Sequence, residues 1–120
     1  GYSISPGKTL SQIESINNST DNVAYVALLE NIIVAWIHIF YTVRLESSHY
    51  CEIGGLVVSS AHRGKGIGKA LIAHSKQWCV AKKVNTLRVR SNVTRTEAHT
   101  FYINAGFQQI KRQEVFAIQL

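Results

Sequence analysis

The sequence predicts one mixed α/β domain, a sandwich of sheet and helices in which the later strand–helix–strand unit is parallel. Three strand-like runs rich in β-branched and aromatic residues follow one another between residues 23 and 59. An amphipathic helical pattern, a short alternating strand and a second helical pattern then follow. With 120 residues, 46% hydrophobic and 17% charged, the composition is globular and allows a buried core without disulfides or metals.

The chain begins with a helix and a hairpin. Residues 9–17 predict a weak helix with apolar residues three apart. Residues 23–29 and 32–45 predict two strands joined by the two-residue turn Glu30-Asn31. Because residues 23–29 are apolar on both faces, we expect both faces of that strand to be covered.

The middle of the chain predicts a strand and the strongest helix. Residues 50–59 form the strand, and Gly54 and Gly55 inside it indicate a bulge or a close approach by another group. Residues 67–83 form the helix. We expect its buried stripe to consist of Ile67, Leu71, His74 and Trp78.

The last elements are shorter. Residues 86–91 predict a strand with alternating apolar and basic side chains, and residues 95–105 predict a helix that Gly106 ends as a left-handed cap. Residues 107–120 predict a final strand or hairpin.

Charge and cysteine content narrow the class of partner. The net charge of +6 favours an anionic ligand, but no run of five like charges exists, so we expect no nucleic-acid partner. Cys51 and Cys79 lie 28 residues apart in no zinc or disulfide motif, which predicts reduced thiols and a cytoplasmic protein. The longest apolar run, residues 32–41, is interrupted by His38 and is too short for a membrane helix, and no signal peptide is visible, so we expect no membrane partner.

The most informative segment is a glycine-rich loop before the helix at residues 67–83. Its three glycines alternate, which lets the backbone bend and a ligand approach closely. The start of the helix offers unpaired N–H groups and a positive dipole end, so the loop predicts a phosphate cradle. The spacing completes neither the P-loop nor the dinucleotide-binding pattern, and a flexible turn without a ligand is the alternative. The loop consists of Arg63, Gly64, Lys65, Gly66, Ile67, Gly68 and Lys69.

Two motifs carry a family resemblance. Arg63, Gly66 and Gly68 form R-x-x-G-x-G, which resembles the pyrophosphate-binding signature of the GNAT superfamily of acetyl-CoA-dependent N-acetyltransferases. Starting 24 residues after Gly68, Asn92, Ala98 and the run FYINAGF resemble the family's second conserved segment. The resemblance covers about residues 23–118 and implies a mixed, largely antiparallel sheet with a splayed central strand flanked by helices. The family's usual N-terminal strand and helix have no counterpart before residue 9.

The resemblance implies acetyl-CoA as cosubstrate and no metal. The loop backbone would hold the pyrophosphate, the Leu56–Val58 backbone would pair with the pantetheine arm, and the Leu56 N–H would polarise the thioester. Asn92 would contact the arm, with a strand-end turn as its alternative role, and Ala98 would leave room for the arm. The expected cofactor-binding residues are Leu56, Val57, Val58, Arg63, Gly64, Lys65, Gly66, Ile67, Gly68, Lys69, Asn92, Ala98 and Tyr102.

Glu52 and Tyr102 are the expected catalytic pair. Glu52 is the only carboxylate on the central strand and would take the proton of the amine. A free carboxyl group has a pKa of about 4.3 and an alkyl ammonium about 10, so direct transfer is uphill by roughly 8 kcal/mol and needs burial, a relay water or an amine that binds neutral. The alternative is that Glu52 binds the cationic amine. Tyr102, by resemblance, would protonate the leaving thiolate, with a core aromatic contact as its alternative role.

The expected activity is transfer of an acetyl group to a primary amine of a small molecule by direct attack in a ternary complex. An aminoglycoside, a polyamine or an amino acid would fit, and a homodimer is left open. Cys51 points away from Glu52 by strand alternation, which argues against an acetyl-cysteine intermediate. The alternatives are an inactive acyl-CoA-binding sensor and an acetyltransferase acting on a protein amine.

Overall fold

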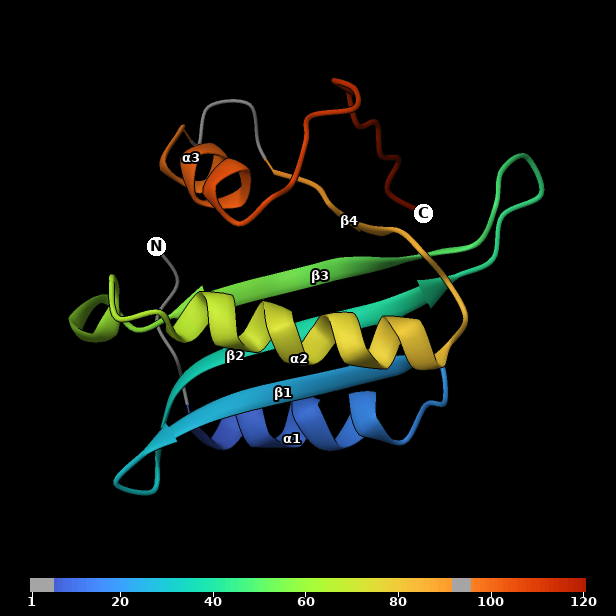
Figure 1. Cartoon of the computed structure of the whole chain (residues 1–120). Helices are drawn as coiled ribbons and strands as arrows, with labels where there is room; N and C mark the ends of the chain where they lie inside the picture. Colours follow the sequence, from blue (N-terminus) through green and yellow to red (C-terminus); the bar gives the residue numbers. More distant parts are fainter. Residues whose placement is uncertain (1–5, 92–95) are drawn as a thin grey trace. The chain divides into compact units, whose positions relative to one another are not determined.

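The computed structural model describes residues 6–91 and 96–120. The chain forms two compact units, Gly1–Arg90 and Ser91–Leu120. The elements are α1 (Pro6–Asn17), β1 (Asn22–Leu29), β2 (Ile32–Thr42), β3 (Tyr50–Val58), the short 3-10 helix η1 (Ser60–His62), α2 (Ile67–Ala81), β4 (Leu87–Val89) and α3 (Thr96–Asn104). The first unit holds a four-stranded sheet in the order β1-β2-β3-β4, as Figure 1 shows. The three long strands are antiparallel, and β4 joins β3 in parallel.

The predicted hairpin is confirmed, together with its turn. Glu30 and Asn31 have φ angles of 52° and 65°, the two positive values that a tight two-residue hairpin turn requires. The prediction that both faces of β1 are covered is wrong, since Leu28 and Leu29 are 60% and 51% exposed. The reason is that β1 is an edge strand of this sheet and its last residues extend toward the hairpin tip.

Helix α2 covers one face of the three antiparallel strands, and α1 packs along β1 (Figure 1). Of the predicted buried stripe of α2, Leu71 is buried, Ile67 and Trp78 are half-buried, and His74 is exposed, with its ring centroid 6.0 Å from that of Tyr25. A 3.6-residue period fits two adjacent stripes almost equally well, and packing on the sheet selects one of them. The residues buried on α2 are Gly68, Leu71, Ile72, Ser75 and Cys79.

The predicted strand at the C-terminus is wrong, because residues 107–120 form neither helix nor strand. Phe116, Ile118 and Leu120 are spaced as on one face of a strand, but Val115, Phe116 and Ile118 are more than four-fifths exposed. A strand needs a partner for its backbone groups, and the second unit has no other strand among its described residues.

Strand β3 is paired along only part of its β4 side, as the family resemblance implies for the central strand. Strand β4 pairs with β3 only at Cys51, Glu52 and Ile53. The register with β2 shifts beside His38, which leaves Gly54 as the extra residue of a bulge. Residues 54–58 therefore have β2 on one edge and no strand of residues 6–90 on the other.

The close approach expected at the two glycines comes from side chains of β2. A Cβ atom on Gly54 would lie 2.7 Å from His38 Nδ1, and one on Gly55 would lie 2.8 Å from the Trp36 ring. Among the residues that the structure places, no helix is long and apolar enough to span a bilayer.

Candidate active site

The glycine-rich loop has an open backbone at the start of α2. Gly64 and Gly66 have φ angles of 76° and 81°, a region that favours glycine, and nothing lies within 4 Å of a Cβ built on either. Gly66 is the residue before α2 and provides no side-chain cap, so the first N–H groups of the helix are not capped by it. This loop can therefore receive an anion on its backbone.

The other expected members of the loop differ in their placement. Gly68 is buried inside α2, so it serves helix packing, and only Gly64 and Gly66 provide the positive φ angles. Lys65 and Lys69 are exposed, whereas Ile67 is half-buried. Arg63 is exposed, and its Nε donates a hydrogen bond to Val58 O at 3.1 Å, which ties the loop to the end of β3.

The open edge of β3 presents main-chain groups beside this loop. The Ser59 N–H donates to Val34 O at 2.8 Å, so Ser59 bonds toward β2. In an antiparallel ladder the direction of the main-chain N–H and C=O groups alternates from residue to residue. The groups of Val57 therefore point toward β2, and those of Leu56 and Val58 point toward the opposite edge. The bond from Arg63 to Val58 O agrees with that direction. The Leu56 N–H is thus available to an incoming carbonyl oxygen.

Glu52 lies on the sheet face opposite α2 and is buried, with 9% of the residue exposed. Its Oε1 accepts a hydrogen bond from Arg90 Nε at 3.1 Å, which forms an ion pair. The carboxylate raises the pKa of Arg90, through this hydrogen bond and through its charge. Arg88 is the β4 residue that pairs with Glu52. Sequence reasoning placed the two arginines on one face but missed the ion pair, because it depends on the β3–β4 register.

Cys51 points to the other face, as strand alternation predicts. It is fully buried, and Cys79 on α2 is also a free, buried cysteine. Burial raises the pKa of both thiols, that of Cys79 to about 12. Neither side chain supplies the exposed thiolate that an acetyl-cysteine intermediate requires.

His38 is a candidate that sequence reasoning missed. Its Nε2 lies 2.8 Å from Asn22 Oδ1, and Asn22 Nδ2 donates to Ser19 Oγ at 3.0 Å, so the amide oxygen faces the imidazole and Nε2 carries the proton. Nδ1 is then an acceptor and lies against Gly54. Burial lowers the pKa of His38, which keeps it neutral at pH 7. In the sequence His38 is only a polar interruption of an apolar run.

The second unit holds the remaining predicted residues. Tyr102 and Ala98 are one turn apart on α3 and both are half-buried. The Tyr102 ring contacts Phe101 and Phe107, with centroid distances of 5.2 and 5.5 Å, and the Phe107 N–H donates to Tyr102 O at 3.0 Å. Asn92 lies outside the described residues.

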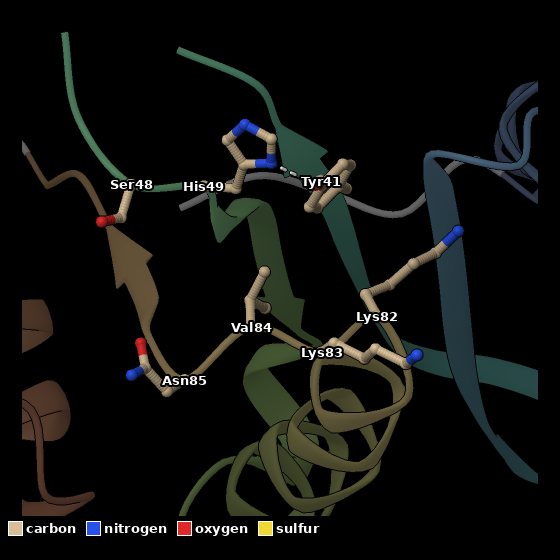
Figure 2. A pocket seen from close by; sticks show the side chains of 7 residues that line it. All are labelled: Tyr41, Ser48, His49, Lys82, Lys83, Val84 and Asn85. Atoms are coloured by element: carbon tan, nitrogen blue, oxygen red, sulfur yellow. Dashed lines mark hydrogen bonds between the residues drawn. The ribbon is translucent and has the colours of Figure 1, made fainter. Parts of the chain in front are cut away.

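A separate pocket of about 410 Å³ lies at the C-terminal end of α2, the end opposite the glycine-rich loop (Figure 2). The Tyr41 hydroxyl and His49 Nδ1 form a hydrogen bond on one side of it, and Lys82 and Lys83 come from the end of the helix. It contains none of the predicted site residues. Its lining consists of Tyr41, Ser48, His49, Lys82, Lys83, Val84 and Asn85.

The sequence profile of the acetyltransferase (GNAT) family matches residues 3–107. The chain belongs to the GNAT acetyltransferase family. This match confirms the resemblance inferred from the two motifs. The loop at α2 and the open edge of β3 both lie within the matched residues.

Two curated relatives carry this GNAT segment. The streptothricin acetyltransferase of Escherichia coli is 27% identical over 95 residues, which cover 79% of this chain and 52% of that protein. The aminoalkylphosphonate N-acetyltransferase of Salmonella typhimurium (strain LT2) is 30% identical over 90 residues, which cover 73% of this chain and 58% of that protein. The chain thus spans about half the length of these relatives.

Solved GNAT structures share the fold. The aminoglycoside 6'-N-acetyltransferase AAC(6')-IG from Acinetobacter haemolyticus has a TM-score of 0.83 at 17% identity. The superposed residues cover 99% of this chain and 85% of that chain. The aminoglycoside N-acetyltransferase AAC(6')-Iy in complex with CoA has a TM-score of 0.85 at 18% identity, with coverages of 95% and 88%. At these identities the likeness establishes the mixed α/β fold predicted from the sequence.

Proposed function

We propose that the protein is an N-acetyltransferase that moves an acetyl group from acetyl-CoA to a primary amine of a small molecule. The observation that carries the proposal is the open loop at Gly64 and Gly66 beside the edge of β3 with which no strand of residues 6–90 pairs beyond Ile53. The loop suits a pyrophosphate, and the edge of β3 suits an extended acyl arm. Membership of the GNAT family supports the assignment of both features to one cosubstrate.

The cosubstrate is held mainly by backbone. The N–H groups of the loop and of the first turn of α2 take the pyrophosphate, and Arg63, Lys65 and Lys69 add positive charge around it. The arm lies along β3, where Leu56 and Val58 present main-chain groups to the open edge. The Leu56 N–H polarises the thioester carbonyl and stabilises the negative charge that develops on its oxygen. By resemblance to the family, Ala98 would leave room for the arm, and Asn92, which lies outside the described residues, would contact it.

The chemistry is a direct attack. The amine nitrogen forms a bond to the carbonyl carbon, the C–S bond breaks, and the products are the N-acetyl amine and CoA. The amine loses one proton to Glu52, directly or through a water, and the thiolate gains one from Tyr102. His38 gives the same sheet face a neutral nitrogen acceptor. The alternative role of Glu52 is to bind the ammonium group, although its pairing with Arg90 already compensates part of its charge.

The experiment is thiol release from acetyl-CoA with a panel of amines, combined with thermal unfolding with and without CoA. We expect CoA to raise the melting temperature and at least one amine to release thiol. Stabilisation by CoA without thiol release from any amine would identify an acyl-CoA sensor. Acetylation of a peptide amine in preference to every small amine would identify a protein acetyltransferase. If CoA leaves the melting temperature unchanged while ADP or NAD raises it, the loop binds a different ligand.

A further inference from the structure

We propose that the acceptor amine carries an anionic group, such as a phosphonate, phosphate or carboxylate, and that Arg88 and Arg90 bind this group. The inference rests on the proposed function and adds the substrate class.

The sheet face that holds Glu52 has an excess of positive charge. The four strands contain one carboxylate, Glu52, and this is already paired with Arg90. Arg88 lies on the same face of β4 two residues before Arg90, and Arg44 follows the end of β2. Neither Arg88 nor Arg44 forms an ion pair with any residue that the structure describes. This face thus carries one carboxylate, bonded to Arg90, and two further arginines, Arg88 and Arg44, beside the neighbouring Tyr50.

Two of these arginines, Arg88 and Arg44, lie over an aromatic ring. Tyr50 is 3% exposed, and Arg88 Cζ lies 4.1 Å and Arg44 Cζ 5.8 Å from its ring centroid. Stacking on a ring orders a guanidinium while leaving its in-plane donors for a ligand. Arg88 Nε is buried and has no hydrogen-bond partner among the described residues, so a ligand would bind the two outer nitrogens of this guanidinium group. A planar, ordered guanidinium is the side chain best suited to a carboxylate or phosphonate.

The position of Arg90 fits a short acceptor better than that of Arg88. Arg90 is bonded to Glu52, four residues before Leu56 and roughly 13 Å away along the strand, whereas Tyr50, on which Arg88 lies, is two residues further away. An amine at the Leu56 thioester position and an anion hydrogen-bonded at about 2.8 Å to an arginine can belong to one small molecule. Half of the Arg90 side chain is exposed, so a ligand can reach it.

The same charges disfavour a polycation. A compound with several ammonium groups, such as an aminoglycoside or a polyamine, would place like charges against unpaired guanidinium groups. A neutral or monocationic amine would gain nothing from them. The anionic group of an anionic amine is attracted by these guanidinium groups. This attraction becomes weaker as salt is added.

The test compares 2-aminoethylphosphonate, β-alanine, propylamine and kanamycin by thiol release and by calorimetric titration. We expect kcat/KM to be highest for one of the two anionic amines. We expect Arg90→Gln, and separately Arg88→Gln, to lower that value by about 10- to 100-fold, the loss typical of a hydrogen bond to a charged group. Arg88→Gln should affect propylamine little, and Arg90→Gln should affect it less than the anionic amines, because Arg90→Gln also removes the partner of Glu52. Lys76→Gln on the exposed side of α2 removes the same charge away from this face and should change nothing. Thermal unfolding checks that the Arg88 variant remains folded after it loses the stacking on Tyr50, and Arg90→Gln serves if it does not.

The outcomes separate the two proposals. A kcat/KM for propylamine or kanamycin equal to or above that for both anionic amines would overturn the charge inference and leave the acetyltransferase intact. An equal decrease of kcat/KM for all four amines in the arginine variants would also overturn the charge inference. If no amine releases thiol, the proposed function fails. The titrations then still decide the charge inference, because 2-aminoethylphosphonate must bind more tightly than propylamine and must lose that advantage in Arg90→Gln.

Discussion

Replacing Gly66 by valine separates cosubstrate binding from folding. Gly66 has a φ angle of 81°, which costs a side-chain-bearing residue roughly 1–2 kcal/mol. No atom lies within 4 Å of its Cβ position, so no collision adds to this cost. For a domain of this size a loss of 1 kcal/mol lowers the melting temperature by about 4 °C, so we expect a decrease of about 4–8 °C without ligand.

The larger effect is expected in the presence of CoA. At 100 times its dissociation constant, a ligand adds about 2.7 kcal/mol, which corresponds to an increase of about 10 °C in the melting temperature of the parent chain. In Gly66→Val the added side chain lies where the phosphates approach the backbone, so this increase should disappear. The assay is thermal unfolding with and without CoA.

A matched control is available outside the loop. Gly106 has a φ angle of 98° and equally open space around it. Gly106→Val should therefore lower the melting temperature to a similar extent but keep the increase caused by CoA. If CoA raises the melting temperature of a folded Gly66 variant as much as that of the parent chain, the assignment of the loop to the pyrophosphate is refuted. If the increase caused by CoA disappears in both glycine variants, backbone strain explains the loss. Gly68 is a poor choice for this test because it is buried in α2.

Four further outcomes are expected. Tyr102→Phe should lower kcat by about 10²- to 10⁴-fold and preserve CoA binding, whereas Tyr25→Phe should leave kcat unchanged; equal rates in both variants would remove Tyr102 as the proton donor. Glu52→Gln should lower kcat most at low pH if Glu52 is the base, while a raised KM with kcat intact would make it a ligand of the amine. Gly54→Ala should lower the melting temperature, since its Cβ would lie 2.7 Å from His38 Nδ1, and an unchanged melting temperature would contradict this packing. Burial lowers the pKa of His38 below its usual value of about 6.5, so the unfolded chain takes up the proton first; the free energy of unfolding should fall as pH drops below about 6.5, and His38→Gln should remove that part of the slope.

The sequence by itself determined the features that depend on local backbone chemistry. Gly64 and Gly66 are recognisable because only glycine adopts their φ angles cheaply, and the turn at Glu30 and Asn31 follows from its two-residue length between two strands. The amphipathic helix after the loop follows from a short-range period, as does the assignment of Cys51 and Glu52 to opposite faces. These features, with the second motif at residues 92–107, were enough to predict the GNAT family and its fold.

The tertiary structure decided what depends on which segments meet. The pairing of Glu52 with Arg90 follows from the parallel register of β3 and β4, and the contact of His38 with Gly54 follows from a bulge between β2 and β3. A pattern with a period of two fixes the faces of a strand but leaves open which residue of another strand lies beside it. The same holds for α2, where packing chose Ser75 over His74 for the buried face. Residues 116–120 have the spacing of a strand, yet the backbone hydrogen bonds that make a strand must come from a partner that their own sequence does not contain.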